Sequence, residues 1–281
     1  MAVSAFIPEV WSAELLVTLE KSLVYGAPGV VNRDYEGEIS QYGDTVHVTT
    51  LADPTIGDYT PHTDITIEDV DDSSKTLLIN QSKYFAFEVD DVEKRQARNG
   101  GALLSEQARK AAYKLRDTAD QFLATTMAAG VDAGNVIAES TVSASDAYDL
   151  LVDMSVLLDE NDVPEEGRWV IVTPAFHGLL LKDDRFVASG DAAGAATRAN
   201  GIVGEAAGFS VRKSNNAPEG ATTGRLLIAG SPIATSYAEQ ISKTEATRKE
   251  KGFADIVKGL HLYGAQVFHP TALVTADVIV G

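Results

Sequence analysis

Cysteine is absent from all 281 residues of the chain, and this absence excludes several kinds of site at once. Disulfide bonds, thiolate-bound metal ions and cysteine nucleophiles all require that residue. Long apolar runs are absent too, since no stretch approaches the roughly 18 apolar residues of a membrane helix, and residues 1–8 lack the basic start of a signal peptide. We therefore expect a cytoplasmic protein that has no membrane partner and is stabilised by packing.

Positive charge is scarce, because 23 Lys and Arg stand against 41 Asp and Glu and the net charge is −18. A protein that holds nucleic acid by neutralising phosphates needs clustered basic residues, so any DNA partner would be enclosed without specific binding. The imbalance is also local. Residues 34–93 contain fifteen acidic residues and two lysines, whereas residues 94–116 contain seven basic residues and one glutamate. An acidic segment is thus followed directly by a basic one.

The residue patterns of common active sites are missing as well. The five histidines lack the spacing of a metal site, and the glycine-rich residues 188–208 contain no phosphate-binding pattern. Three pairs of adjacent aspartates fit solvated or helix-capping roles better than the roles of glycosidase carboxylates. We predict that the protein is not an enzyme and has no catalytic, cofactor-binding or metal-binding residues. A cytoplasmic acidic hydrolase with an unrecognised site is the alternative that remains open.

An apolar stripe at helical spacing stands near the N-terminus. After Pro8, which suits a first helical turn, the stripe continues until Gly26 and Pro28 end it. Its residues are Val10, Trp11, Leu15, Leu19 and Leu23. An amphipathic helix at a chain end needs a surface to cover, either in its own domain or in a neighbour. Trp11 and Leu15 are therefore candidates for contacts between subunits.

The acidic segment has the pattern of a long hairpin arm. Residues 44–50 are rich in β-branched residues, and a second run begins at 76–79 and continues through 84–89, with Phe85, Phe87 and Val89 on one face. The roughly 25 residues between the two runs are too polar to build a core of their own. Such an arm is marginal in isolation and is expected to rest on another surface. The candidate contact residues of the arm are Asp53, Asp58, Tyr59, Asp64, Glu68, Asp69, Asp71 and Asp72.

The longest helical signal covers residues 104–130. Apolar residues recur there with a period of 3.6, which predicts a helix of about 26 residues and roughly 40 Å. Its other faces carry Arg109, Lys110, Lys114 and Arg116. These basic residues are either a solvated helix face or the surface that receives the acidic arm of a neighbour, and we take them as further interface candidates.

The remainder of the chain has a mixed α/β pattern. We predict a helix over 145–158, a buried strand over 169–172 and a second helix that begins at Pro174. Further strands are predicted at residues 209–211, 225–229 and 264–268. This half of the chain is therefore expected to form a compact α+β domain.

Five local sequences occur in an order that resembles the Hong Kong 97 type major capsid proteins of tailed bacteriophages. They are GDTVHV (43–48), FAFEVDD (85–91), VPEEGRWVIVTP (163–174), GEAAGF (204–209) with SNN (214–216), and GAQVFHP (264–270). The resemblance covers nearly the whole chain. It implies an α+β fold divided into an N-arm (1–35), an extended β-hairpin E-loop (36–89), a peripheral domain with a long spine helix (90–135), an axial domain (136–255) and a C-terminal strand that returns to the domain core (256–281).

The resemblance also implies a function. The chain would be the major capsid protein that self-assembles into hexamers and pentamers of an icosahedral shell around phage double-stranded DNA. It would be located in the virion capsid and assembled in the host cytoplasm. Expected partners are copies of the chain, a separate scaffolding protein, a portal and a possible decoration protein. A bacterial nanocompartment shell protein, which shares the fold but encloses enzymes, is the alternative.

Overall fold

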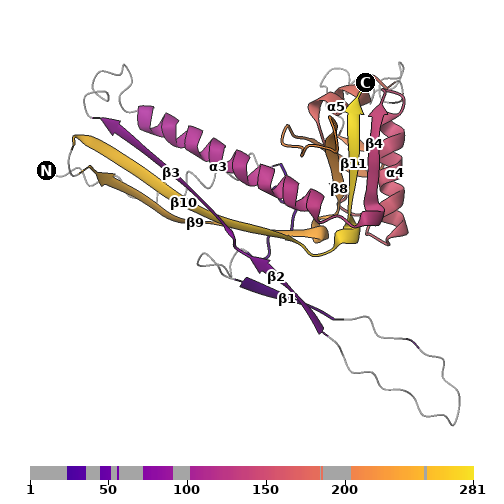
Figure 1. Cartoon of the computed structure of the whole chain (residues 1–281), viewed down its shortest axis with the longest axis horizontal. Coiled ribbons are helices and arrows are strands. Elements are labelled where there is room, and N and C mark those ends of the chain that lie inside the picture. Colours follow the sequence, from indigo (N-terminus) through magenta and orange to yellow (C-terminus); the bar gives the residue numbers. More distant parts are fainter. Residues whose placement is uncertain are drawn as a thin grey trace, which may run out of the picture.

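The computed structural model describes residues 24–35, 45–51, 56, 72–90, 102–183, 185, 204–249 and 252–281. Within these residues the protein is elongated, with a long helix on a narrow sheet in one half and a compact α+β domain in the other (Figure 1). A two-stranded hairpin projects from the side of the narrow sheet that faces away from the helix (Figure 1). The predicted N-terminal helix and most of the polar tip of the arm lie outside the described residues.

The compact half is built on a six-stranded sheet. Its order is β4 (Val136–Val142), β11 (Leu273–Val280), β8 (Arg225–Gly230), β5 (Trp169–Val172), β7 (Phe209–Lys213) and β6 (Glu205–Ala206). Every residue of β5 is buried, which explains its continuous apolar sequence. Helix α4 (Ala147–Glu160) packs on β11 and also contacts α5 (Pro174–Leu180). The predicted bounds of β5 are confirmed, and helices and strands of this half form an α+β unit as predicted. The strand predicted at residues 264–268 is instead the end of β10 (Ala254–Val267), which belongs to the sheet of the elongated half together with β9 (Thr235–Arg248).

The elongated half consists of helix α3 (Ala102–Ala129) and a three-stranded sheet. The sheet order is β3 (Gln81–Asp90), β10 (Ala254–Val267) and β9 (Thr235–Arg248), with antiparallel pairing throughout. The helix buries Leu115, Leu123 and Met127 along one face, and its Phe122 ring meets the Tyr263 ring of β10 edge-on at a centroid distance of 5.4 Å. The predicted long helix is confirmed.

Strand alternation gives the narrow sheet two different faces. Tyr263 points toward α3, so residues an even number of positions away along β10 share that face. The Phe85 and Phe87 rings stack at 6.0 Å on this side, and Val89 packs with Val257. The predicted single face of β3 is therefore confirmed. The intervening residues of β3 and β10 point to the opposite side, where no described helix covers them.

The arm begins as a hairpin but differs from the prediction in its second leg. Strand β1 (Thr45–Leu51) pairs antiparallel with β2 (Asp72–Leu78) as a separate two-stranded sheet. The prediction that the second run continues unbroken through residue 89 is wrong, because the chain leaves the hairpin after Leu78 and β3 joins a different sheet. The physical reason is that Leu77 and Ile79 are buried against the face of the narrow sheet opposite α3. This contact holds the chain where it passes from β2 to β3.

A close backbone approach at Gly264 provides a test of this arm root. A Cβ at Gly264 would lie 2.3 Å from the Leu78 carbonyl oxygen and 3.0 Å from the Ile79 Cα. We expect Gly264→Ala to lower the free energy of unfolding by about 1–3 kcal/mol through overpacking. Gly178→Ala is the matched control, since nothing lies within 4 Å of its Cβ position in α5 and the change should stabilise by about 0.5–1 kcal/mol. Urea unfolding of both variants measures the difference, and an unchanged Gly264→Ala variant would contradict the packing.

Candidate assembly interface

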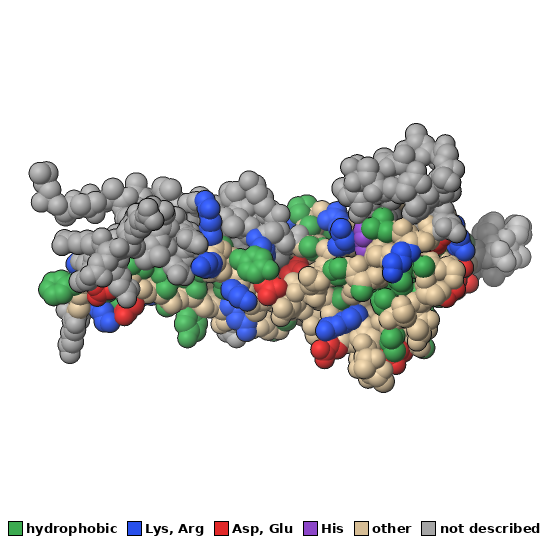
Figure 2. Space-filling view, turned by 90° about the horizontal axis from the view of Figure 1, so that it is seen from above, with side chains coloured by type: hydrophobic (Ala, Val, Ile, Leu, Met, Phe, Trp, Pro, Cys, Tyr) green, Lys and Arg blue, Asp and Glu red, His purple; other side chains and the backbone are tan. Residues whose placement is uncertain are grey.

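The sequence-predicted basic residues of α3 lie on one helical segment. Arg109, Lys110 and Lys114 are exposed, and the Arg116 guanidinium lies 4.8 Å from the centre of the Tyr113 ring. Tyr113 is itself 54% exposed, so a large aromatic group stands among the basic side chains. We call Arg109, Lys110, Tyr113, Lys114 and Arg116 the basic helix face. Figure 2 views the protein from the α3 side and shows Lys and Arg side chains over the elongated half.

The other predicted interface residues cannot be placed beside this face. Asp72 is the first residue of β2, where only the backbone is described. Outside the described residues lie Trp11, Leu15, Asp53, Asp58, Tyr59, Asp64, Glu68, Asp69 and Asp71. The pairing of the acidic arm with the basic helix face therefore stays a prediction.

A buried carboxylate fixes the start of the described chain to α3. Asp120 accepts hydrogen bonds from the backbone N–H groups of Val24 (3.0 Å) and Tyr25 (2.8 Å) and from Asn216 Nδ2 (2.9 Å). Burial raises the pKa of Asp120, although its three hydrogen bonds act in the opposite direction. The phenol pKa of Tyr25 is also raised, by burial and by the nearby Asp120 carboxylate. The Asp120 side chain thus joins three parts of the protein: the chain at Val24 and Tyr25, helix α3, and the loop of the compact domain that contains Asn216.

A second buried group fixes the same segment to the narrow sheet. Arg33 Nη2 lies 3.0 Å from Glu239 Oε1, while Glu239 Oε2 accepts a hydrogen bond from the Tyr237 hydroxyl at 2.7 Å and lies 3.2 Å from His261 Nε2. Burial favours the neutral acid, but the hydrogen bond and charge of His261, together with Arg33 and Tyr237, lower the pKa of Glu239 overall. Glu239 is therefore a buried, ionised anchor with three partners.

The arm root is a third anchor, and it is apolar. Leu77 and Ile79 are buried with Ala238, Leu262 and Phe268 on the face of the narrow sheet opposite α3. Lys75 Nζ donates a hydrogen bond to the Phe268 carbonyl oxygen beside this cluster. Sequence reasoning missed all three anchors, because none forms a local motif. The alternation of apolar residues along the strands indicated a buried face, but nothing in the sequence indicated which charged residues lie in it.

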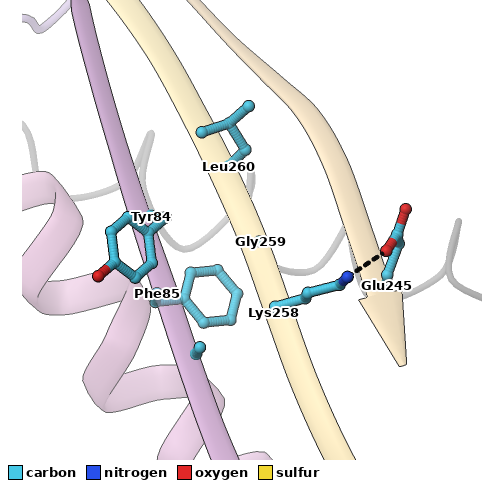
Figure 3. Close-up of a pocket in the computed structure, with 7 residues that line it drawn as sticks. Tyr84, Phe85, Glu245, Lys258, Gly259 and Leu260 are labelled. Carbon is cyan, nitrogen blue, oxygen red and sulfur yellow. Dashed lines mark ion pairs between the residues drawn. The ribbon is translucent and has the colours of Figure 1, made fainter. Parts of the chain in front are cut away.

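Beyond the arm root, no other described element covers this face of the sheet, and it forms a groove of about 430 Å³. Tyr84, Ala86 and Leu260 line it, and Tyr84 is 78% exposed. The Phe85 ring lies beside Gly259 of β10, where a Cβ would lie 2.3 Å from the ring (Figure 3), and both residues also line the groove. Lys258 Nζ closes one end of the groove by pairing with Glu245 Oε2 at 2.8 Å (Figure 3). We call Tyr84, Ala86, Glu245, Lys258 and Leu260 the sheet groove.

Metal sites and membrane-spanning helices were sought among the described residues. Among them, no three acidic, histidine or cysteine side chains are grouped to hold a metal ion. No helix in the described ranges has the length and apolar character needed to cross a membrane. The prominent features are instead an arm with an anchored root, a basic helix face and an apolar groove, which are the features of a subunit that binds other protein surfaces.

Solved structures show the same architecture. The chain is similar to a structure from Mycobacterium phage Che8, with 30% identity, a TM-score of 0.74 and coverage of 98% of each chain. It is also similar to the capsid of cyanophage P-SCSP1u, with 17% identity, a TM-score of 0.72 and coverage of 86% of this chain and 85% of that one. The fold is therefore the Hong Kong 97 type, and the protein is a capsid shell subunit by class.

The family follows from the sequence itself. A model of the family described as "Phage capsid protein" matches residues 74–276, which is most of the chain. The chain belongs to this phage capsid protein family, and the predicted resemblance is confirmed. It is a structural component of a phage capsid, and proteins of this family and fold are generally not enzymes.

Two further comparisons bear on the alternatives. No sequence among the curated proteins matches the chain. A structure of the holo-SrpI encapsulin complex from Synechococcus elongatus matches with 9% identity and a TM-score of 0.57, covering 85% of this chain and 83% of that one. At that identity the likeness shows a shared fold alone.

The buried Glu239 anchor predicts a pH-dependent stability. Its folded-state pKa lies below the ordinary value of 4.5, so the ionised group stabilises the protein above that pH and the contribution is lost as the pH falls. We expect Glu239→Gln to cost about 3 kcal/mol at neutral pH, with a gap to the unmodified protein that narrows below pH 4.5. Urea unfolding at several pH values measures this gap.

The matched control is Glu219→Gln. Glu219 is 84% exposed and lies 3.7 Å from Arg225, so this change should cost only about 0–1 kcal/mol at any pH. If the two glutamine variants lose the same stability, Glu239 does not act as a buried anchor.

Proposed function

We propose that the protein is the major capsid protein, which self-assembles into hexamers and pentamers of an icosahedral shell around double-stranded DNA. The observation that supports this most directly is the arm. Strands β1 and β2 form a sheet of their own, and among the described elements β1 pairs only with β2. A two-stranded sheet is marginal alone, so a neighbouring subunit is the surface that would stabilise it.

The acidic arm is proposed to contact a basic surface of the neighbour. Residues 34–93 have a strong excess of acidic residues, and the basic helix face offers cations of which Arg109, Lys110 and Lys114 are exposed. Opposite charges on the two partners would guide the arm to its place. Exposed ion pairs contribute only about 0–1 kcal/mol each, so they would determine register more than binding strength.

The charge of the chain also suits an enclosing wall. A net charge of −18 disfavours tight binding of phosphates, and the packaged DNA would be retained by the closed shell. We further propose that assembly takes place in the host cytoplasm with a separate scaffolding protein and a portal, and that a decoration protein can bind the finished shell. We also propose that the chain is divided into an N-arm, an E-loop, a peripheral domain, an axial domain and a C-terminal strand, with the bounds that the resemblance implies.

A nanocompartment shell is the second candidate, and the similarity to an encapsulin structure is the observation that favours it. The match of the phage capsid family to most of the chain favours the first candidate. The contents of purified particles separate the two, because a phage capsid holds nucleic acid that resists nuclease, whereas a nanocompartment holds protein.

Shortening the arm tests its role in assembly. Leu51 and Asp72 are paired residues at the outer end of the β1–β2 ladder, so an Asn-Gly turn can replace residues 52–71 without changing the register. We expect this variant to fold with unchanged circular dichroism and thermal stability but to fail to form shells in electron micrographs. Normal shells from the shortened chain would contradict the proposed role of the arm.

Reversing charge on the basic helix face tests the pairing with the arm. Lys110→Glu with Lys114→Glu should impair assembly, measured by sedimentation, far more than it lowers the stability of the free subunit. The control is Lys83→Glu with Lys182→Glu, which changes charge equally at two exposed lysines outside that face. Equal assembly of both double variants at low salt would count against the pairing.

A further inference from the structure

Two carboxylates of the compact domain lie close together under a short loop. Glu139 belongs to β4 and Asp277 to β11, which are neighbouring parallel strands of the six-stranded sheet. A β-bulge interrupts their pairing between Ala276 and Val278, so two residues of β4 stand opposite Asp277. A bulge changes the direction of a side chain, and bulges are common beside functional sites. Here the loop that precedes β8 contacts both carboxylates.

The loop supplies hydrogen-bond donors to the two carboxylates. The Ala221 N–H donates to Asp277 Oδ2 at 2.6 Å. The Thr222 hydroxyl and the Gly224 N–H, the latter at 3.2 Å, both donate to Glu139 Oε1. These bonds fix the carboxylates next to each other in spite of their like charges.

One oxygen of this arrangement, Asp277 Oδ1, is left over. The Asp277 residue is only 5% exposed, and Oδ1 is buried without a hydrogen-bond partner among the described residues. The loop reaches this atom through two glycines, Gly220 and Gly224, at which a Cβ would lie 1.9 and 2.0 Å from Oδ1. No basic side chain of the described ranges pairs with either carboxylate, since Arg225 beside the loop pairs with Glu219 at 3.7 Å. A buried carboxylate oxygen is costly unless a donor or a positive charge replaces water.

We propose that Glu139, Asp277 and the loop of residues 219–224 bind one calcium ion. A Cβ at Gly224 would also lie 3.1 Å from Glu139 Oε1, so this oxygen and Asp277 Oδ1 are at most about 5 Å apart, which two Ca–O bonds of roughly 2.3–2.6 Å can span. Backbone carbonyl oxygens of residues 221–223 and water would complete the coordination. The sequence-based expectation of no metal site rested on histidine and cysteine patterns, which a cation that prefers oxygen ligands does not need.

The ion would fasten the edge of the sheet. Strand β4 is the outermost strand of the described sheet and is paired with β11, while the loop leads into β8 on the other side of β11 (Figure 1). A calcium ion shared by β4, β11 and the loop would neutralise two like charges and join three elements that hydrogen bonds alone hold at this point. Calcium should therefore stabilise the folded subunit.

Urea unfolding of the full chain tests the site. Metal is removed with EDTA, the EDTA is dialysed away, and unfolding is compared with and without added CaCl2. With about 10 mM CaCl2 and a dissociation constant on the order of 10⁻⁴–10⁻³ M, the equilibrium constant for folding should rise about 10–100-fold. MgCl2 at the same concentration controls for ionic strength and should have a much smaller effect. Isothermal titration calorimetry with CaCl2 should give one ion per chain.

The variants separate this site from general binding of cations to an acidic protein. Asp277→Asn keeps the size of the side chain but removes its charge, so it should abolish the calcium response. Asp153→Asn, the same change at an exposed position of α4, is the matched control and should keep the response. If Asp277→Asn does not fold, Glu139→Gln makes the same test at a half-buried position, and the response should again be lost.

Several results would overturn the proposal. An unmodified protein that does not respond to calcium has no such site. Equal calcium responses of Asp277→Asn and Asp153→Asn would mean that calcium only screens the net charge of −18, and equal stabilisation by MgCl2 would contradict a calcium site in the same way. None of these measurements requires shells, so each outcome leaves the proposed capsid function untouched.

Discussion

A two-stranded ribbon in water has too little apolar contact to stabilise itself, and this constraint governs the arrangement of the protein. Leu77 and Ile79 give the arm its described apolar attachment, beneath β10. Beyond that root, β1 and β2 have backbone pairing with each other, and no third strand of the described ranges joins them. Under the proposed function, the arm depends on this base at one end and on the surface of a neighbouring subunit along its length.

The base is held together by two buried carboxylates, Asp120 and Glu239, each of which has partners on both of its oxygens. Asp120 contacts Val24 and Tyr25 and Glu239 contacts Arg33, so residues 24–33 are fixed to α3 and to β9 at the same time. Burying a carboxylate is costly unless hydrogen bonds or opposite charges replace water, and here both kinds of partner are present. The subunit can then present its arm and its open sheet face in defined directions.

The local sequence pattern was enough to predict elements whose own residues show a continuous apolar run or a clear helical period. Residues 169–172 are apolar throughout and α3 has a long helical period, so both were predicted correctly. Strand β9 was missed because its second half is an almost continuous polar run, SKTEATR (242–248), without the apolar alternation of a strand. The division between β2 and β3 depends on contacts with residues near 262–268. The anchors join residues 95 to 206 positions apart, such as Asp120 with Tyr25 and Glu239 with Arg33, and a single sequence contains no local signal for them.

The central claim is that the arm gains its stability from neighbouring subunits, and hydrogen exchange of free and assembled protein tests it most directly. The account predicts that amides of β1 and β2 exchange rapidly in the free subunit and become protected in assembled particles, while amides of β5 and β8 in the compact core are protected in both. If the arm is equally protected in the free subunit, it is stable on its own and the claim is wrong.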